Sequence, residues 1–311
     1  MAGGARGPHN LPVPQAPLNA FTVDVEDYFQ VSAFEGSVPR EAWEALSSRI
    51  DKGLTGLLDL MDRSGVRGTF FILGWVARRR PELVRSISDR GHEIGCHSQE
   101  HRLVYSQTPA EFRADLRDAL GALQDATGRP CTAYRAPTFS ITKQSLWALP
   151  ILAEEGIRLE SSIYPVFHDR YGIPGAPRFP YRPLPDLPDF VEFPPSTFRH
   201  FGMTLPCAGG GYLRIYPPAL TRHALRQIND TERQPAVVYV HPWEFDPEQP
   251  VVAGGRLRNF RHRVNIRVMA DRVSRLLGEF RFSTLSGVLV GLGGPEALPF
   301  HDLAPVPAPT A

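Results

Sequence analysis

Residues 66–101, VRGTFFILGWVARRRPELVRSISDRGHEIGCHSQEH, decide the fold of this chain. Residues 68–73 are a short apolar run of the kind that forms a buried strand. Pro81 favours the first turn of a helix, and the helical pattern that follows it ends near Gly91. Residues 93–96 are again strand-like. A strand, a helix and a second strand in this order predict a parallel βαβ unit.

The same alternation of strands and helices continues on both sides of this unit. A helix is expected between the capping box Thr108-Pro109-Ala110-Glu111 and Gly128, whereas the proline-rich residues 165–206 indicate an elaborated loop and residues 209–211 (GGG) a turn. The other expected elements are strands at 20–25, 132–135, 158–163, 236–240 and 281–285 and helices at 50–63, 144–155, 218–228 and 266–280. The pattern predicts an α/β fold with a parallel sheet, either open or closed into a barrel.

The composition excludes several classes of protein. The 311 residues are enough for one large domain, and their formal net charge of +1 gives no support for a nucleic-acid or membrane-surface partner. Three cysteines at irregular spacing (Cys96, Cys131 and Cys207) are not a disulfide framework and suit a reducing compartment. No apolar run has the length of a transmembrane segment.

We expect both ends of the sequence to be disordered. Residues 1–18 are rich in glycine, proline and alanine and lack the uninterrupted apolar stretch of a signal peptide. We therefore expect a disordered leader and a cytoplasmic protein. Residues 291–311 are expected to form a second loose end.

Acidic side chains at a strand end form the first candidate site. In residues 22–27 (TVDVED), Asp24 and Glu26 share one face of an extended segment, and Asp27 points away unless the strand ends earlier. Two carboxylates on one side can divide the work, one binding a metal ion and the other acting as a base. Taken alone, the segment is more typical of a solvated acidic loop.

Two histidines follow the strand at 93–96. If residues 97–101 (HSQEH) turn helical, His97 and His101 lie on one face, close enough to share a metal ion. The pattern differs from the zinc-protease motif because Glu100 precedes the second histidine instead of following the first. Two exposed histidines at a helix start explain the pattern equally well.

An arginine and a third histidine also end expected strands. A buried Arg135 needs a carboxylate partner, and Asp24 is the obvious one. His241 follows an apolar strand directly before Pro242, and a histidine there suits a general acid. The alternatives are a surface arginine and a core histidine bonded to the backbone. Parallel α/β folds place their sites at the carboxyl ends of strands, so we expect all these residues in one site.

In this order the four segments resemble those of the polysaccharide deacetylases, the NodB-homology or family 4 carbohydrate esterases. The resemblance covers residues 19–289, and residues 160–162 (ESS) are similar to the family's D-S-S segment, with Glu160 in place of the aspartate. The chain looks closest to the deacetylases encoded with exopolysaccharide and exosortase systems. Residues 256–290 resemble the C-terminal extension of those deacetylases. The resemblance implies a single-domain, distorted (β/α) barrel in which residues 19–290 form the catalytic domain.

The resemblance implies metal-dependent removal of acetyl groups from the N-acetylated sugars of a polysaccharide, in exopolysaccharide biosynthesis. It also implies a cytoplasmic enzyme associated with a membrane-bound polysaccharide assembly system. Asp24 matches the family's catalytic base, Arg135 the residue that orients the base and His241 the general acid.

The resemblance implies one divalent metal ion held by His97 and His101, and Zn²⁺ suits two imidazoles best. Val25 occupies the position of the family's metal-binding aspartate, so the third ligand is either Glu26 or Asp27. Strand geometry favours Glu26, which shares a face with the base.

The substrate is expected to contact three further residues. A backbone N–H near Thr138 would stabilise the oxyanion. Trp243 and Tyr164 would line a sugar groove, although aromatic residues of this kind are more typical of the core. A group of arginines in the C-terminal extension could meet an anionic glycan, or it is a solvated loop with scattered charge. Its members are Arg256, Arg258, Arg261, Arg263 and Arg267.

Other functions share parts of this pattern. Two histidines and a carboxylate also describe non-haem iron oxygenases, but those enzymes have double-sheet β folds. An amidohydrolase that acts on a small cyclic amide, as allantoinase-like relatives do, and a catalytically silent glycan-binding relative are the closer alternatives. Asp24, Arg135 and His241 together argue against the silent relative, because binding alone requires neither an acid nor a base.

Overall fold

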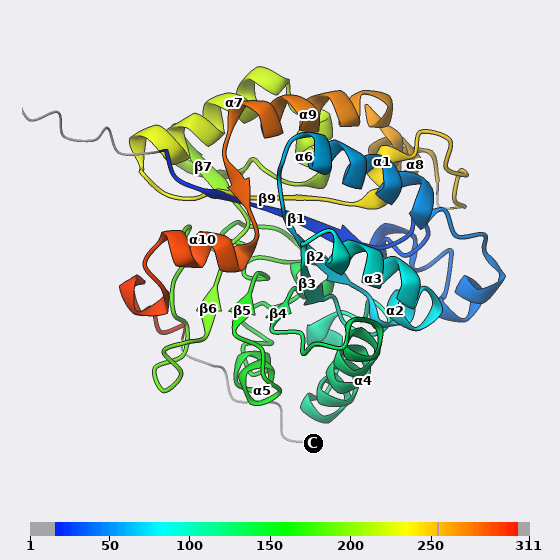
Figure 1. Ribbon diagram of the computed structural model, residues 1–311, viewed down its shortest axis with the longest axis horizontal. Helices are drawn as coiled ribbons and strands as arrows, with labels where there is room; N and C mark the ends of the chain where they lie inside the picture. Colours follow the sequence, from blue (N-terminus) through cyan, green and yellow to red (C-terminus); the bar gives the residue numbers. More distant parts are fainter. Residues whose placement is uncertain (1–15, 254, 304–311) are drawn as a thin grey trace, which may run out of the picture.

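The computed structural model describes residues 16–253 and 255–303, and its centre is a curled sheet (Figure 1). All pairs in this sheet are parallel, in the order β10-β1-β2-β3-β4-β5-β6, with β9 on the opposite edge of β1. A separate antiparallel hairpin consists of β7 and β8. The strands are β1 Asn19–Val25, β2 Thr69–Ile72, β3 Glu93–Cys96, β4 Ala133–Tyr134, β5 Leu159–Glu160, β6 Val191–Glu192, β7 Thr197–His200, β8 Met203–Pro206, β9 Val237–Val240 and β10 Phe282–Ser283.

Helices surround the sheet, with α1, α7 and α9 on one side of β1 and β9 and α2 to α5 on the other (Figure 1). No helix among the described residues is long and apolar enough to cross a membrane. The α-helices are α1 Ile50–Arg63, α2 Gly74–Arg79, α3 Pro81–Asp89, α4 Pro109–Thr127, α5 Ala148–Glu154, α6 Gly210–Ile215, α7 Pro218–Arg226, α8 Arg256–Arg263, α9 Met269–Glu279 and α10 Leu285–Gly291. Short 3-10 turns at Pro137–Phe139 and Pro242–Phe245 follow β4 and β9.

The two faces of the strands bury two different apolar clusters. Side chains alternate along each strand, so residues two apart share a face. The outward side chains, such as Phe21, Val23 and Phe70, pack beneath the helices. The inward side chains form a smaller cluster inside the curled sheet, with Ala20, Phe71, Ala133, Leu159, Val191 and Val237 as members. The inner cluster lies mainly at the amino ends of the strands, which leaves the inner positions at the carboxyl ends for polar residues.

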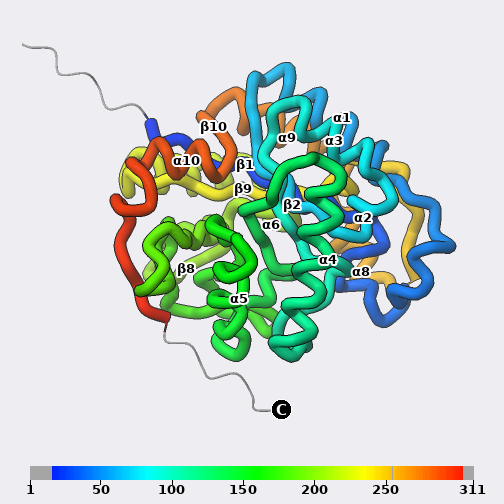
Figure 2. Tube along the Cα trace, turned by 60° about the horizontal axis from the view of Figure 1, so that its bottom comes forward, coloured from blue at the N-terminus to red at the C-terminus, as the bar shows by residue number. Residues whose placement is uncertain are grey.

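Helix α10 closes the amino end of the sheet. It follows β10 directly and places Leu285 and Val288 against the inner apolar cluster. Figures 1 and 2 both show α10 beside β1 and β10. Burial of each of these side chains contributes about 1.5–3 kcal/mol. The interior is therefore a packed core at one end and not an open channel.

The structure confirms the predicted distorted (β/α) barrel and several element boundaries. Helix α1 spans Ile50–Arg63 as expected. Thr108 Oγ1 accepts the Glu111 N–H at 3.3 Å and the Glu111 carboxylate accepts the Thr108 N–H, so the capping box is present. Gly128 ends α4 with a φ of 71°, a conformation that glycine adopts without strain.

Two expectations for the middle of the chain were wrong. Residues 165–206 are not only loop, because β6 extends the main sheet and β7 and β8 form a hairpin. Residues 209–211 are not a turn, because α6 begins at Gly210. A Cβ atom at Gly209 would lie 1.7 Å from the Tyr239 ring, and one at Gly210 would lie 3.0 Å from the His241 ring. The glycines therefore allow α6 to start against β9.

The expectation for the C-terminal segment was wrong in its described part. The Arg182 side chain donates from Nε to the Leu298 carbonyl, and Leu298 is buried. The Arg182 backbone N–H donates to the Pro299 carbonyl, and the Arg182 carbonyl accepts from the His301 N–H. Residues 291–303 therefore pack on the domain, because their backbone groups pair with residue 182. Residues 304–311 of the expected tail and residues 1–15 of the expected leader lie outside the described residues.

Candidate active site

The carboxyl ends of five strands deliver polar side chains to the inside of the sheet. Asp24 follows Ala20 and Thr22 on the inner face of β1, in the two-residue period of an extended chain. The corresponding inward positions beyond β3, β4, β5 and β9 hold His97, Arg135, Ser161 and His241. The structure therefore brings the four sequence segments together at one end of the sheet.

Arg135 is fully buried and binds Asp24. Its Nη1 donates to Asp24 Oδ1 at 2.7 Å and to Thr22 Oγ1 at 2.8 Å. Its Nε and Nη2 donate to the backbone carbonyl and the hydroxyl of Ser161 at 3.0 and 2.8 Å. A buried guanidinium with these acceptors satisfies the requirement for a paired interior charge. Because Asp24 Oδ1 is occupied, Asp24 Oδ2 is the oxygen that remains open to the site.

Glu26, His97 and His101 form the candidate metal site. One ligand atom of each residue lies within 4.8 Å of the others, and all three side chains are buried. His101 Nε2 is 2.9 Å from Glu26 Oε2. Burial acts to raise the pKa of Glu26, but the neighbouring His101, His241 and His97 together lower it to about 2. Glu26 is therefore a carboxylate at neutral pH.

His97 presents a neutral imidazole with a defined tautomer. Its Nδ1 lies 2.8 Å from the backbone carbonyl of Arg135, and a carbonyl can only accept. The proton is therefore on Nδ1, which leaves the Nε2 lone pair free for a metal ion. Burial lowers the pKa of His97 to about 4, which keeps the ring neutral at neutral pH.

The two histidines come together through a loop and not through a helical turn. Residues 97–103 contain no helix, and Ser98 and His101 have φ values of 69° and 55°. The rings have centroids 5.3 Å apart at 67°. The helical face that would unite them is therefore absent, and two left-handed residues turn the chain instead. Backbone conformations of this kind are often found at functional sites.

Asp27 points away from this site. Its carboxylate accepts hydrogen bonds from the Tyr28 N–H, the Ser48 hydroxyl and the Arg49 N–H, which hold the start of α1. The chain bends directly after β1, where Glu26 N–H donates to the Asp24 carbonyl. Glu26 therefore joins the histidines, and Asp27 supports the segment that leads into α1.

His241 is held by a carboxylate that sequence reasoning missed. Glu244 Oε2 accepts from the His241 N–H at 3.0 Å and lies 3.2 Å from His241 Nδ1. Arg214 Nε donates to Glu244 Oε1 at 2.6 Å. His241 Nε2 faces the site, 3.9 Å from Asp24 Oδ2 and 3.6 Å from Glu26 Oε1. The three-residue spacing of His241 and Glu244 was the available sequence signal.

The electrostatics of this group favour a protonated His241. Burial acts to lower the pKa of His241, but the hydrogen bond and charge of Glu244, with the charges of Glu26 and Asp24, raise it to about 9. A divalent cation at the neighbouring ligands would act in the opposite direction, because like charges repel. The position of His241, and not this pKa, therefore makes it a candidate acid.

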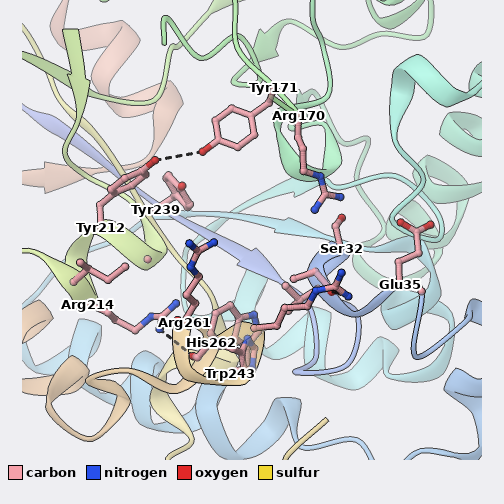
Figure 3. A pocket seen from close by; sticks show the side chains of 16 residues that line it. Ser32, Glu35, Arg170, Tyr171, Tyr212, Arg214, Tyr239, Trp243, Arg261 and His262 are labelled. Carbon is pink, nitrogen blue, oxygen red and sulfur yellow. Dashed lines mark hydrogen bonds between the residues drawn. The ribbon is translucent and has the colours of Figure 1, made fainter. Parts of the chain in front are cut away.

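Trp243 connects the candidate metal site to a pocket beside it. Its Nε1 donates to Glu26 Oε1 at 3.3 Å, and its ring stacks between His241 and His262 at centroid distances of 5.0 and 4.1 Å. Figure 3 shows Trp243 and His262 together at the wall of this pocket, whose volume is about 920 Å³. His262 comes from α8, so the C-terminal segment helps to build the site.

Thr138 is linked to His101 through Ser32, whereas Tyr164 does not line the pocket. Thr138 has a φ of 54°, and its hydroxyl is 2.7 Å from Ser32 Oγ, which in turn is 3.4 Å from His101 Nδ1. Tyr164 is fully buried, so the expectation that it contacts substrate was wrong. Its ring lies beneath that of Tyr171, with centroids 5.7 Å apart at 16°, and Tyr171 lines the pocket instead.

Glu160 belongs to a buried carboxyl pair behind the site. Its carboxylate accepts hydrogen bonds from the N–H and the hydroxyl of Ser162, and Ser162 Oγ accepts the Ala136 N–H. Burial raises the pKa of Glu160, and burial together with the charge of Glu160 raises the pKa of Glu192 well above its usual range. Glu160 supports the segment after β4 through Ser162, and Glu192 accepts the Ile163 N–H after β5.

Two family models match this chain. Residues 49–155 match the model for polysaccharide deacetylase, and residues 161–290 match a domain of unknown function, DUF3473. Both histidines of the candidate metal site lie in the first match, and His241, Glu244 and Trp243 lie in the second. Both matched segments and the preceding strand β1 therefore contribute to the site.

The chain is also similar to deacetylases over part of its length. It is 34% identical over 89 residues to the peptidoglycan-N-acetylglucosamine deacetylase PgdA of Listeria monocytogenes, which is 29% of this chain and 19% of that protein. It is 31% identical over 81 residues to the peptidoglycan-N-acetylmuramic acid deacetylase PdaA of Bacillus subtilis, which is 26% of this chain and 31% of that protein. The chain thus spans less than a third of either relative.

The whole fold is similar to that of a solved structure. A candidate polysaccharide deacetylase from Mycobacterium smegmatis has a TM-score of 0.58 and 20% sequence identity, and the match covers 93% of this chain and 94% of that one. This similarity covers nearly the whole chain, and it supports the barrel assignment.

Proposed function

We propose that this chain hydrolyses the acetamido groups of N-acetylated sugars in a polysaccharide, and the match of residues 49–155 to the model for polysaccharide deacetylase supports this proposal. The observation that carries this proposal is the meeting of a metal-ligand set with two groups able to move protons, Asp24 and His241. The relatives named for N-deacetylation of peptidoglycan support the same class of reaction.

The proposed enzyme uses one divalent metal ion, which Glu26, His97 and His101 would hold. These residues fit an ion because the carboxylate is ionised, His97 offers a free Nε2, and the three ligand atoms converge. Two imidazoles and a carboxylate suit Zn²⁺. When bound, the ion would polarise the acetyl carbonyl and lower the pKa of the attacking water.

Asp24 is the proposed base. Its Oδ2 is open to the site, while Arg135 holds its Oδ1 and fixes the orientation of the carboxylate. Asp24 Oδ2 takes a proton from the water that attacks the acetamide carbon. Arg135 cannot compete for this role, because a guanidinium has no atom that accepts a proton, and its Nε and Nη2 donate to Ser161.

His241 is the proposed acid. Its Nδ1 is held by Glu244, which leaves Nε2 directed at the site to protonate the departing amine. Glu244 and Arg214 are positioning residues that fix the ring. Thr138 is the proposed neighbour of the acetyl oxygen, where its backbone N–H would stabilise the oxyanion.

We also propose that residues 19–290 form the catalytic domain and that the enzyme acts in exopolysaccharide biosynthesis, in the cytoplasm beside a membrane-bound assembly system. The support is the resemblance of residues 256–290 to the C-terminal extension of deacetylases from such systems. The acetyl content of the polymer made by cells that lack this protein tests the proposed role.

Acetate release from a panel of N-acetylated oligosaccharides, with and without a chelator, tests the reaction. We expect acetate release that stops with the chelator and returns with Zn²⁺. Hydrolysis of a small cyclic amide that is indifferent to chelator would favour the allantoinase-like alternative. Glycan binding without any hydrolysis would indicate a silent relative.

A further inference from the structure

A pocket beside the site contains charged residues that play no part in the proposed chemistry. It lies between the segment after β1, the loop after β5 and helices α6 and α8 (Figure 3). Ser32 and Trp243 line this pocket and also contact the proposed metal ligands, His101 and Glu26. A glycan whose acetamido group reaches these ligands therefore has this pocket next to it.

Two of the charged residues that line the pocket are already neutralised. Arg214 Nε lies 2.6 Å from Glu244, and this pair is buried. Glu35, the carboxylate in the pocket lining, lies 2.7 Å from Arg40. Neither residue therefore offers a free charge to a ligand.

Three further arginines line the pocket without a carboxylate partner. No Asp or Glu side chain in the part of the chain that the structure describes forms an ion pair with Arg170, Arg258 or Arg261. Figure 3 shows Arg170 and Arg261 pointing into the pocket from different walls. Arg258 donates to the Ala33 carbonyl at 3.3 Å, which fixes α8 beside the segment after β1. The pocket thus carries a concentrated positive charge, although the formal net charge of the chain is only +1.

We propose that this pocket binds a negatively charged group on a sugar next to the acetylated one, so that the substrate is an acidic polysaccharide. This inference rests on the proposed function. Guanidinium groups form paired hydrogen bonds with carboxylate and phosphate groups. The hydrogen bonds that they form with the hydroxyl groups of neutral sugars are weaker, because those acceptors carry no charge. Tyr171 and Tyr212, whose hydroxyls are 3.5 Å apart, add ring faces to the same pocket.

The arginines of the C-terminal segment divide into two groups, which supplies a matched control. Arg258 and Arg261 line the pocket, whereas Arg256 lies on the same helix and lines a different surface depression. All three side chains are exposed. Arg256→Ala therefore removes the same charge from the same helix without touching the pocket.

Binding of oligosaccharides without acetyl groups tests the inference independently of catalysis. Calorimetric titrations of the full chain would use three ligands. Two are anionic, namely glucose 6-phosphate and a trisaccharide of galacturonic acid, and the third is a neutral trisaccharide of galactose. We expect at least one anionic ligand to bind about 10-fold or more tightly than the neutral trisaccharide, with affinity that falls as salt rises. The anionic ligand that binds shows whether the group is a carboxylate or a phosphate.

The double variant Arg258→Ala/Arg261→Ala should weaken anion binding about 10–100-fold, because charge-assisted hydrogen bonds are lost. Arg256→Ala should bind like the wild type. Equal binding of the charged and neutral ligands, or equal losses in the double variant and Arg256→Ala, would overturn the inference. A protein that binds an anionic sugar yet releases no acetate from any glycan would instead overturn the proposed function alone.

Discussion

The carboxyl and amino ends of the sheet differ in how their inward positions are filled, although one alternating backbone builds both. At the carboxyl end these positions hold Asp24, His97, Arg135 and His241, whose polar groups meet within one site. At the amino end they hold Ala20, Ala133 and other apolar residues, which α10 covers. The same alternation of side chains along the strands thus places the candidate catalytic residues at one end of the sheet and a packed apolar core at the other.

Polar groups also occur at the amino end, and several of them satisfy one another. The side-chain amides of Asn19 and Asn229 exchange two hydrogen bonds, at 3.0 and 2.8 Å, at the start of β1. Thr69 and Ser286 donate to the carboxylate of Glu93 and tie β2, β3 and α10 together. At the carboxyl end, in contrast, Asp24 Oδ2 faces the open site. A carboxylate oxygen that faces the site, and not polarity itself, therefore distinguishes the functional end.

The largest effect on turnover is expected from Asp24→Asn at the carboxyl end. An amide cannot take the proton of the attacking water, so kcat should fall about 10²–10⁴-fold. The fold should remain, because the amide oxygen can still accept from Arg135. Acetate-release kinetics and thermal unfolding measure the two effects. Near-normal turnover in Asp24→Asn would show that another group is the base.

The next largest effect is expected on the affinity of the protein for Zn²⁺, and it distinguishes the roles of Glu26 and Asp27. Glu26→Ala removes a proposed ligand, so Zn²⁺ affinity should fall by more than the about 10–100-fold typical of residues that only orient a ligand. Asp27→Ala is the matched control, since its carboxylate contacts Ser48 and Arg49 and not the histidines. Asp27→Ala should lower the free energy of unfolding and leave the affinity for Zn²⁺ unchanged. Competition with a chelating dye measures both variants, and the reverse pattern would assign the ligand to Asp27.

Acid should destabilise the amino end through His92. Burial and the nearby Arg67 lower the pKa of His92 to about 4, and its Nδ1 accepts the Gly68 N–H at 3.2 Å. The unfolded chain therefore binds the proton more readily, so the stabilisation is complete above about pH 6.5 and is lost as the pH falls toward 4. This contribution amounts to at most about 3 kcal/mol.

Urea unfolding at pH 7 and pH 4.5 checks this prediction against His92→Gln. Glutamine can accept the same N–H but does not titrate, so the variant should lose less stability than the wild type between the two pH values. Equal losses in both proteins would mean that other groups, such as those at the carboxyl end, govern acid unfolding.

The sequence predicts the elements that depend on local rules. Helix α4 follows from its capping box, and the pairing of Arg135 with Asp24 follows from the cost of an unpaired buried charge. The period of two also predicts that Glu26 shares a face with Asp24. Each of these rules needs only neighbouring residues or one obligatory partner, so a single sequence is enough.

The remaining features depend on contacts between distant segments. Arg214 reaches Glu244 across 30 positions, and His262 stacks on Trp243 from a helix that no periodicity indicates. Tyr164 is buried because its ring packs between Phe139 and Tyr171, and sequence spacing says nothing about which ring is outside. The loop that unites His97 and His101 uses left-handed residues other than glycine, which carry no clear sequence signal.

The smallest effect should come from the neutral amide pair, and it completes the contrast between the two ends. Asn229→Ala removes both hydrogen bonds to Asn19 and the donation from Asn229 Nδ2 to the Gln234 carbonyl. Asn19 keeps two backbone partners, the Arg281 carbonyl and the Ala236 N–H, so its amide is not left bare. We therefore expect a loss of about 1–3 kcal/mol in the free energy of unfolding. Turnover per folded molecule and Zn²⁺ affinity should stay at wild-type values, because these contacts lie at the end of β1 remote from Asp24. Urea unfolding, acetate release and metal titration of the same preparation test all three. A fall in turnover without a fall in stability would show that the two ends are coupled and that the contrast between them is wrong.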